Sequence, residues 1–290
     1  MKIARECIPC LARQATEIAV KSTDDKLVQE EIIIKCLEEL SKLDFELSAP
    51  EIGRLMHLHA MNITGNFNPY QKLKDEYNEI ALDITDIIKR EQWIEDANDP
   101  FDLACRLSIA GNIIDFSVGL NLDYSKILAS VSDSLESPLF GDGPKVLKES
   151  ITNAKNIMFI ADNAGEIIFD KFLLEQLPTD KVTYVVKGGP IVNDATIDDV
   201  HFAGIDKMVK VIDNGVAAQG TILNECSEEF LKAYCNADVV ISKGQANYET
   251  LSDENKNIFF LLRAKCESVA KSFGCNKMDY VLTLSKKLTM

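Results

Sequence analysis

The sequence predicts an α/β protein in which a helical N-terminal portion is attached to a doubly wound, mostly parallel sheet. In the first third of the chain, apolar residues recur every three or four positions with charged residues between them, which is typical of amphipathic helices. From about residue 155, short β-branched runs alternate with helical stretches. This alternation is typical of βαβ units, whose parallel sheets are covered by helices on both faces.

The helical portion divides into four predicted helices, over residues 9–21, 25–43, 49–62 and 70–92. A polar break at residues 22–25 precedes a new helix start, and Pro50 suits the first turn of the third helix. The composition shifts at residues 96–100. We therefore predict a helical domain over residues 1–96 and a Rossmann-like α/β/α domain over residues 97–290.

The second portion contains six predicted strands, which cover residues 157–161, 182–187, 208–212, 239–242, 258–262 and 280–284. The predicted helices between them cover residues 165–177, 193–202, 220–236 and 265–273. Residues 141–145 are predicted to form a loop. In an open α/β sheet, ligands bind beyond the carboxyl ends of the strands, so the residues that follow each strand are candidates for a site.

The composition restricts the classes of partner. The chain has 46 acidic and 31 basic residues and a formal charge of -15, which disfavours binding to a nucleic acid. No apolar run approaches the length of a membrane span, and the N-terminus lacks the core of a signal peptide, so we expect a cytoplasmic protein with no membrane partner. The sequence does not indicate an oligomeric state.

Cysteines in the cytoplasm are expected to stay reduced. Six of the eight are predicted to be buried and inert, because free Cys is usually buried: Cys36, Cys105, Cys226, Cys235, Cys266 and Cys275. Cys7 and Cys10 form a C-x-x-C pair ahead of a helix, which either serves redox or metal chemistry or has a structural role.

Two strand ends carry oxygen ligands suited to a hard cation. Asp162 and Asn163 follow the first predicted strand, and Asn193 and Asp194 come shortly after the second. Carboxylate and amide oxygens suit Mg²⁺ or Mn²⁺. Each pair alone is also typical of helix capping, but their joint occurrence favours a metal site at these two strand ends.

Other positions suit a phosphate group. Lys187 and Gly188 follow the second strand, where the lysine supplies charge and the glycine permits close approach of the backbone. Lys243 precedes a glycine and a helix start. Asn112 and Asp115 are three residues apart, so they would share a helix face. The alternatives are an ordinary turn, a solvated lysine and a helix interior, respectively.

Several common motifs are missing. The chain has no P-loop, no G-x-G-x-x-G after a strand and no G-x-S-x-G, and it has only three histidines. These absences weigh against a P-loop nucleotide site, a dinucleotide enzyme, an esterase and a multi-histidine zinc centre.

Taken together, the ordered motifs resemble those of the damage-control phosphatase family, in particular its prokaryotic branch with an N-terminal C-x-x-C. The resemblance rests on segments that extend over nearly the whole chain: Cys7 to Cys10, Asn68-Pro69-Tyr70 with Lys74, residues 111–116, residues 161–166, residues 187–196 and residues 243–249.

This resemblance implies a helical domain packed on an α/β/α sandwich, and a metal-dependent phosphatase that hydrolyses phosphate monoesters of small metabolites. It implies that Asp162, Asn163 and Asp194 hold a divalent ion, for which Mg, Mn, Co and Ni are the candidates. It further implies that Lys243 and a helix start at Gly111 and Asn112 contact the phosphate, with Asp115 in the same pocket. Lys187 stands where relatives often have Arg, which puts a bidentate phosphate contact there in question.

Catalysis would then rest on positioning and charge stabilisation by Asp162 and Lys243. Either water or the carboxylate of Asp162 would attack the phosphorus. Two rival functions remain: an S-adenosylmethionine-dependent methyltransferase, since the fold also hosts that chemistry, and a non-enzymatic module that binds a phosphorylated ligand or a metal.

Overall fold

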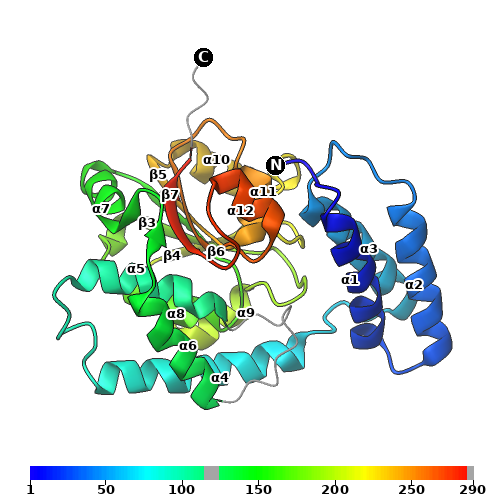
Figure 1. Cartoon of the computed structure of the whole chain (residues 1–290), viewed down its shortest axis with the longest axis horizontal. Coiled ribbons are helices and arrows are strands. Elements are labelled where there is room, and N and C mark those ends of the chain that lie inside the picture. The colour runs from blue at the N-terminus through cyan, green and yellow to red at the C-terminus, as the bar shows by residue number, and fades with distance from the viewer. Residues whose placement is uncertain (114–123, 286–290) are drawn as a thin grey trace.

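The computed structural model of the chain describes residues 1–113 and 124–285, and it confirms the predicted α/β class (Figure 1). Within those ranges, seven strands form one sheet with the order β1-β7-β6-β5-β2-β3-β4. The strands are β1 (Leu139–Phe140), β2 (Ile157–Ile160), β3 (Val182–Val186), β4 (Lys210–Asp213), β5 (Val239–Lys243), β6 (Ile258–Arg263) and β7 (Tyr280–Leu284). Only the pairing of β6 with β7 is antiparallel in this sheet.

The strand order has a reversal that positions the site. Strands β2, β3 and β4 follow one another in one direction, whereas β5 returns to pair with β2 on its other side. The chain therefore leaves the carboxyl ends of β2 and β5 in opposite directions. Ligands of doubly wound folds bind at such a reversal.

Helices cover both faces of the sheet because its strands are apolar on both sides. Phe159 of β2 points into one core, and its neighbours Met158 and Ile160 point into the other. The first core is shared with α5 (Pro100–Ala110), α7 (Gly143–Asn153), α8 (Glu166–Leu174) and α9 (Ile197–Ala203). The second is shared with α10 (Glu228–Asn236), α11 (Gln245–Leu251) and α12 (Glu267–Phe273). A further helix, α6 (Tyr124–Glu136), lies beside α5.

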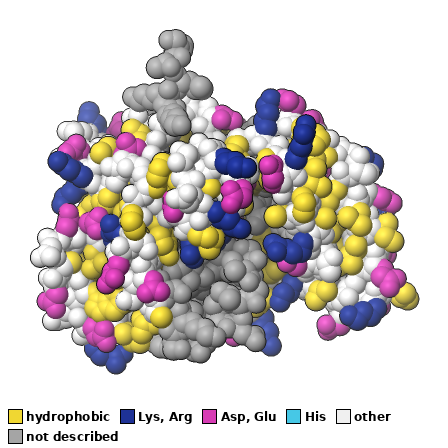
Figure 2. Space-filling view, viewed as in Figure 1, with side chains coloured by type: hydrophobic (Ala, Val, Ile, Leu, Met, Phe, Trp, Pro, Cys, Tyr) yellow, Lys and Arg dark blue, Asp and Glu magenta, His cyan; other side chains and the backbone are white. Residues whose placement is uncertain are grey.

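Three N-terminal helices form a separate lobe at the right of Figure 1: α1 (Cys7–Ser22), α2 (Lys26–Leu40) and α3 (Ala49–Thr64). Ile18, Ile32 and Met56, one from each helix, are fully buried in a common core. The predicted start of α3 is present, since Ser48 and Glu51 form a capping box around Pro50. Figure 2 shows apolar side chains on the surface of this lobe. Leu27 and Ile34 of α2 are exposed.

The fourth helix, α4 (Gln71–Arg90), runs beneath the sheet portion rather than within the lobe (Figure 1). Its buried Tyr77, Ala81, Ile84 and Ile88 belong to the core that contains α5 and α8. The proposed domain boundary between residues 96 and 97 remains a prediction. Helix α4 lies before this boundary in the sequence, but it shares a core with α5 and α8, which lie after it.

Some predicted elements differ from those observed. The predicted loop at 141–145 is wrong, because α7 begins at Gly143, where Pro144 is tolerated in the first helical turn. The helix predicted at 193–202 begins only at Ile197, since Asn193 and Asp194 lie in a turn. The strand predicted at 208–212 begins at Lys210, after a 3-10 turn over Ile205–Lys207. Strand β1 is too short for the sequence pattern to reveal.

Within the described residues, no helix has the length and apolar character that crossing a membrane requires.

A buried ion pair fastens α4 to α9. Lys74 Nζ lies 2.7 Å from Asp199 Oδ2, both side chains are almost fully buried, and Lys74 also donates to Thr196 Oγ1. We predict that Lys74→Met lowers the free energy of unfolding by about 3 kcal/mol, because it leaves a buried carboxylate without its cation. Urea denaturation measures this loss. The control is Lys72→Met, an exposed position in the same turn, which should change stability by less than about 0.5 kcal/mol. Equal effects of the two substitutions would contradict the interpretation.

Glu249 of α11 is also buried, and burial raises its pKa from 4.5 to about 7, while the ammonium of Met1 acts in the opposite direction. A carboxyl pKa that is higher in the folded state makes stability fall as pH rises from the unfolded pKa to the folded one. Relative to Glu249→Gln, the wild type should therefore lose about 3 kcal/mol of stability between about pH 4 and pH 8. Unfolding curves across that range test this, with exposed Glu95→Gln as control. A difference that does not change with pH would refute it.

Candidate active site

The loops that follow β2 and β3 lie side by side at the carboxyl edge of the sheet. Asn163 pairs with Asp194 in an isolated antiparallel bridge. The backbone N–H of Ala195 donates to the carbonyl of Asp162 (2.8 Å), and the N–H of Ala164 donates to that of Asn193 (2.8 Å). The structure thus brings together Asp162, Asn163 and Asp194, all of which are buried.

Two amides converge on the carboxylate of Asp162. Asn112 Nδ2 donates to Asp162 Oδ2 (3.0 Å) and to Glu166 Oε2 (2.7 Å). Asn163 Nδ2 donates to the same two oxygens, at 2.8 and 3.0 Å. Since an amide has its N–H₂ and its C=O on opposite branches, neither carbonyl oxygen takes part in these hydrogen bonds.

The charges of this cluster are suited to a cation. Burial raises the pKa of Asp162 well above its ordinary value, and the neighbouring carboxylates of Glu166 and Asp194 raise it further. Asn112 Oδ1 is buried and has no hydrogen-bond donor among residues 1–113 and 124–285. Two carboxylates and amide oxygens are the donor set that a hard divalent ion prefers, so these residues fit such an ion.

Across the described part of the chain, no three Asp, Glu, His or Cys side chains are arranged to hold a metal ion. An ion held by Asp162 and Asp194 would therefore need an amide oxygen beside them, and Asn163 is the predicted source of that oxygen. Mg²⁺ in proteins commonly has few protein ligands and retains several waters.

Lys243 is completely buried and is connected to this cluster through Glu166. Its Nζ donates to Glu166 Oε1 (2.7 Å), Asp170 Oδ1 (2.6 Å) and the carbonyl of Ser108 (2.8 Å). Burial alone would lower the pKa of Lys243, but Asp170 and Glu166 raise it above its ordinary value, so the ammonium stays charged. Since its three N–H groups are all engaged, a contact with phosphate requires the ammonium to leave one of these partners.

Lys187 is buried beside the predicted ligands. Its Nζ lies 3.4 Å from Asp194 Oδ2 and donates to Gly220 O and to Asn247 Oδ1 (3.3 Å). Position 188 requires glycine because the backbone of Gly215 packs closely against it. A Cβ at Gly188 would lie 2.4 Å from the carbonyl carbon of Gly215. This close approach of two chain segments explains the glycine without a ligand, and its predicted phosphate contact stays a prediction.

The predicted helix start at Gly111 and Asn112 is wrong. Gly111 lies at the C-terminal end of α5, and a 3-10 turn, η1 (Gly111–Ile113), follows it. The helix begins earlier, where Asp99 caps its N-terminus ahead of Pro100. Asn112 therefore reaches the site from a helix end, and Asp115 lies outside the described residues.

Helix α4 supports the loop after β2. Asn78 Oδ1 accepts a hydrogen bond from the N–H of Gly165 (2.6 Å), and Asn78 Nδ2 donates to Asp199 Oδ1 (2.9 Å). Asp199 in turn accepts from the N–H and hydroxyl of Thr196, at 2.8 Å each. One helix thus braces the segments that carry Asp162 and Asp194.

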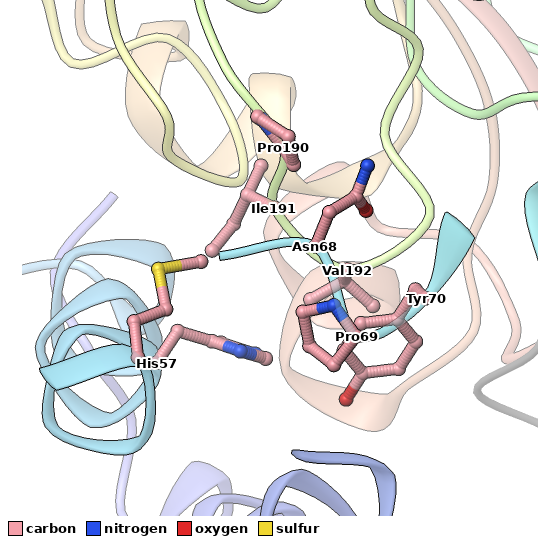
Figure 3. Close-up of a pocket in the computed structure, with 8 residues that line it drawn as sticks. His57, Asn68, Pro69, Tyr70, Pro190, Ile191 and Val192 are labelled. Atoms are coloured by element: carbon pink, nitrogen blue, oxygen red, sulfur yellow. The ribbon is translucent and has the colours of Figure 1, made fainter. Parts of the chain in front are cut away.

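The helical lobe packs against the loop that carries Asp194 (Figure 3). Side chains from both parts fill the space between them. His57 of α3, Pro69 and Tyr70 face Val192, two residues before Asp194. Burial lowers the pKa of His57 to about 4, so this histidine is neutral near pH 7. Val192 has a φ of 44°, an unfavourable value for a β-branched residue, within a turn closed by the bond from Asp194 N to Ile191 O. Packing against the lobe therefore supports a strained turn next to a predicted ligand.

Comparison with known proteins identifies the family. The damage-control phosphatase ARMT1-like domain matches residues 3–281. The chain is 39% identical to damage-control phosphatase PH1575 of Pyrococcus horikoshii, over 99% of both proteins, and 35% identical to a damage-control phosphatase of Archaeoglobus fulgidus, over 97% of this chain and 98% of that protein. A crystal structure of a DUF89 family protein from Pyrococcus horikoshii superposes with a TM-score of 0.90 at 36% identity, covering 99% of this chain and 100% of that one.

The chain belongs to the damage-control phosphatase family.

Membership confirms the family that the motifs suggested and the class of activity, a phosphatase acting on metabolites. The damage-control phosphatase family is generally metal dependent, in agreement with the donor set at the edge of the sheet. The identity of the metal and the roles of the individual residues remain predictions.

Sequence reasoning missed three charged residues of this damage-control phosphatase. Glu166 and Asp170, both in α8, are fully buried partners of Lys243. Lys265 follows β6, is half-buried, and lowers the pKa of Asp162 through its charge. The rule applied to the other strand ends would have found Lys265, since it lies just beyond a predicted strand.

The cysteines differ partly from the prediction. All eight are free, and Cys36 and Cys105 are buried as expected. Cys235 is exposed, and Cys226, Cys266 and Cys275 are half-buried, so the prediction of buried thiols is wrong for these four. Cys7 and Cys10 lie in the first turn of α1, half-buried and exposed.

Gly244 offers a test of the site. Its φ is 79°, and a Cβ there would lie 1.9 Å from Asp162 Oδ2. We predict that Gly244→Ala displaces Asp162 and weakens Mn²⁺ binding at least about tenfold. The matched control is Gly143→Ala, with a φ of 78° and no atom within 4 Å of the added Cβ. Both substitutions place a Cβ at a positive φ, but only the first should affect a Mn²⁺ titration. Equal Mn²⁺ affinities would contradict the assignment of Asp162.

Proposed function

We propose that this chain is a metal-dependent phosphatase that hydrolyses phosphate monoesters of small metabolites, such as sugar phosphates or damaged phosphometabolites. The observation that carries the proposal is the convergence of Asp162, Asn163 and Asp194 at the strand-order reversal of a family member. Family membership supports this reading over a methyltransferase.

Asp162, Asn163 and Asp194 would hold one divalent ion, with Mg, Mn, Co and Ni as candidates. Such an ion supplies positive charge that stabilises the oxygens of a transferring phosphoryl group. The amides of Asn112 and Asn163 hold the Asp162 carboxylate in one orientation through the bonds described above. The site then requires little rearrangement when its ligands bind.

Lys265 is the cation that would approach the phosphate, and Lys187, whose ammonium is held by Gly220, Asn247 and Asp194, would add positive charge from a short distance. Lys265 is half-buried at the end of β6, so it borders both solvent and the Asp162 cluster. Lys187 is nearer to Asp194. Asn112, Gly111 and Gly188 remain proposed neighbours of the substrate, and Lys243 would act on the reaction through Glu166, because its N–H groups are engaged there.

Water is the attacking group that the contacts favour. Asp162 Oδ2 already accepts two amide N–H bonds, which reduces its nucleophilicity. In the proposed hydrolysis, a bond forms between the water oxygen and phosphorus as the ester P–O bond breaks. The attacking water gives up a proton and the leaving alkoxide takes one up, so the products are the alcohol and inorganic phosphate.

The proposal is tested by phosphate release from p-nitrophenyl phosphate and a panel of sugar phosphates. The protein is first treated with a chelator, and Mg²⁺, Mn²⁺, Co²⁺ or Ni²⁺ is then restored singly. We expect release only with added metal. Asp162→Asn and Asp194→Asn should each reduce it at least about a hundredfold, because each removes a charged ligand.

Asp96→Asn, an exposed position, is the control and should leave release unchanged. Thermal unfolding verifies that each variant is folded. A folded wild-type protein that binds inorganic phosphate but releases none from any ester, with any metal, would instead identify a binding module.

A further inference from the structure

Glu166, the first residue of α8, uses both oxygens of its buried carboxylate. Oε1 accepts from the ammonium of Lys243 at 2.7 Å. Oε2 accepts from the amides of Asn112, at 2.7 Å, and Asn163, at 3.0 Å. Glu166 thus connects a buried cation on one side with two site amides on the other.

The orientation of an asparagine amide decides whether it can bind a cation. Its oxygen is a ligand, whereas its N–H₂ group is a donor that a cation repels. Glu166 Oε2 accepts from the N–H₂ group of Asn163 at 3.0 Å and, together with Asp162 Oδ2 at 2.8 Å, keeps that group turned inward. The amide oxygen of Asn163 is then left on the side away from Glu166.

Lys243 fixes the position of the Glu166 carboxylate. Its ammonium holds Oε1 at 2.7 Å, and Asp170 and the Ser108 carbonyl hold the ammonium in place, so Oε2 is left facing the two amides.

We propose that Glu166 is a positioning residue that orients the amide of Asn163, so that its oxygen and not its nitrogen faces the metal. This inference rests on the proposed function, which makes Asn163 a metal ligand. It gives the buried Lys243–Glu166 pair a role in metal affinity, without contact between either residue and the substrate.

The test is Glu166→Gln, which preserves the size of the side chain. Lys243 retains the glutamine oxygen, since charge-assisted hydrogen bonds are the stronger ones. The glutamine N–H₂ group then faces the N–H₂ groups of Asn112 and Asn163. Only Asp162 Oδ2 still holds the Asn163 amide in its orientation, so the amide oxygen faces the metal less often. We expect Mn²⁺ binding by the full chain, measured by electron paramagnetic resonance of free Mn²⁺, to weaken about 10–100-fold.

Asp170→Asn is the matched control. Asp170 is as buried as Glu166 and pairs with the same ammonium at 2.6 Å, but its other contacts are Ser108 and Tyr184. Both substitutions remove one buried negative charge, and only Glu166→Gln disturbs the amides. Asp170→Asn should weaken Mn²⁺ binding less than about threefold. Equal losses in the two variants would show an effect of charge alone and overturn the proposal.

Asn163→Asp provides a second test, which also applies if Glu166→Gln fails to fold. The two oxygens of an aspartate make its orientation irrelevant, and its carboxylate accepts from the glutamine N–H₂ group. In the Asn163→Asp background, Glu166→Gln should therefore leave Mn²⁺ affinity equal or higher. Lower affinity in the double variant overturns the proposal.

The wild-type titration separates this inference from the proposed function. A wild type that binds no Mn²⁺ would refute both. A wild type that binds Mn²⁺, with Glu166→Gln binding it within twofold, would refute only the role of Glu166.

Discussion

The buried ammonium of Lys243 is the interaction on which the site depends. It comes from the end of β5 and joins α8, through Glu166 and Asp170, to α5, through the carbonyl of Ser108. Removing one partner from such a group leaves an uncompensated buried charge, which is strongly destabilising. The bonds of Lys243 therefore fix how α5 and α8 pack on the sheet. The Glu166 carboxylate that binds Lys243 also accepts hydrogen bonds from Asn112 and Asn163 of the site.

A second set of buried bonds holds the site from the N-terminal side. Lys74 and Asn78 of α4 meet Asp199, while Asn78 also holds the N–H of Gly165. The helical lobe adds the contact of His57 and Tyr70 with Val192. The N-terminal helices are thus part of the support for the loops that carry Asp162 and Asp194, although they supply none of the three proposed metal ligands.

The site breaks the usual rules of burial in the way that functional sites do. Asp162 is held among other carboxylates, which raises its pKa and makes its ionised form unfavourable without a cation. Val192 adopts a strained backbone conformation next to this cluster. The packed helices and strands around the site stabilise both features. A divalent ion would reduce the repulsion between the Asp162 carboxylate and its neighbours.

By itself, the sequence determined the alternation of strands and helices, because periodicity is a local property. It also determined that Asp162, Asn163 and Asp194 lie together, since the carboxyl ends of neighbouring parallel strands meet at one edge. Only the tertiary structure decided that Lys243 points at Glu166 and Asp170, and that Asn112 arrives from the end of a helix. The direction of a lysine at a strand end is set by helices packed on it from distant parts of the chain. No local pattern contains that information, and so the sequence could not distinguish a structural lysine from one that faces the ligand.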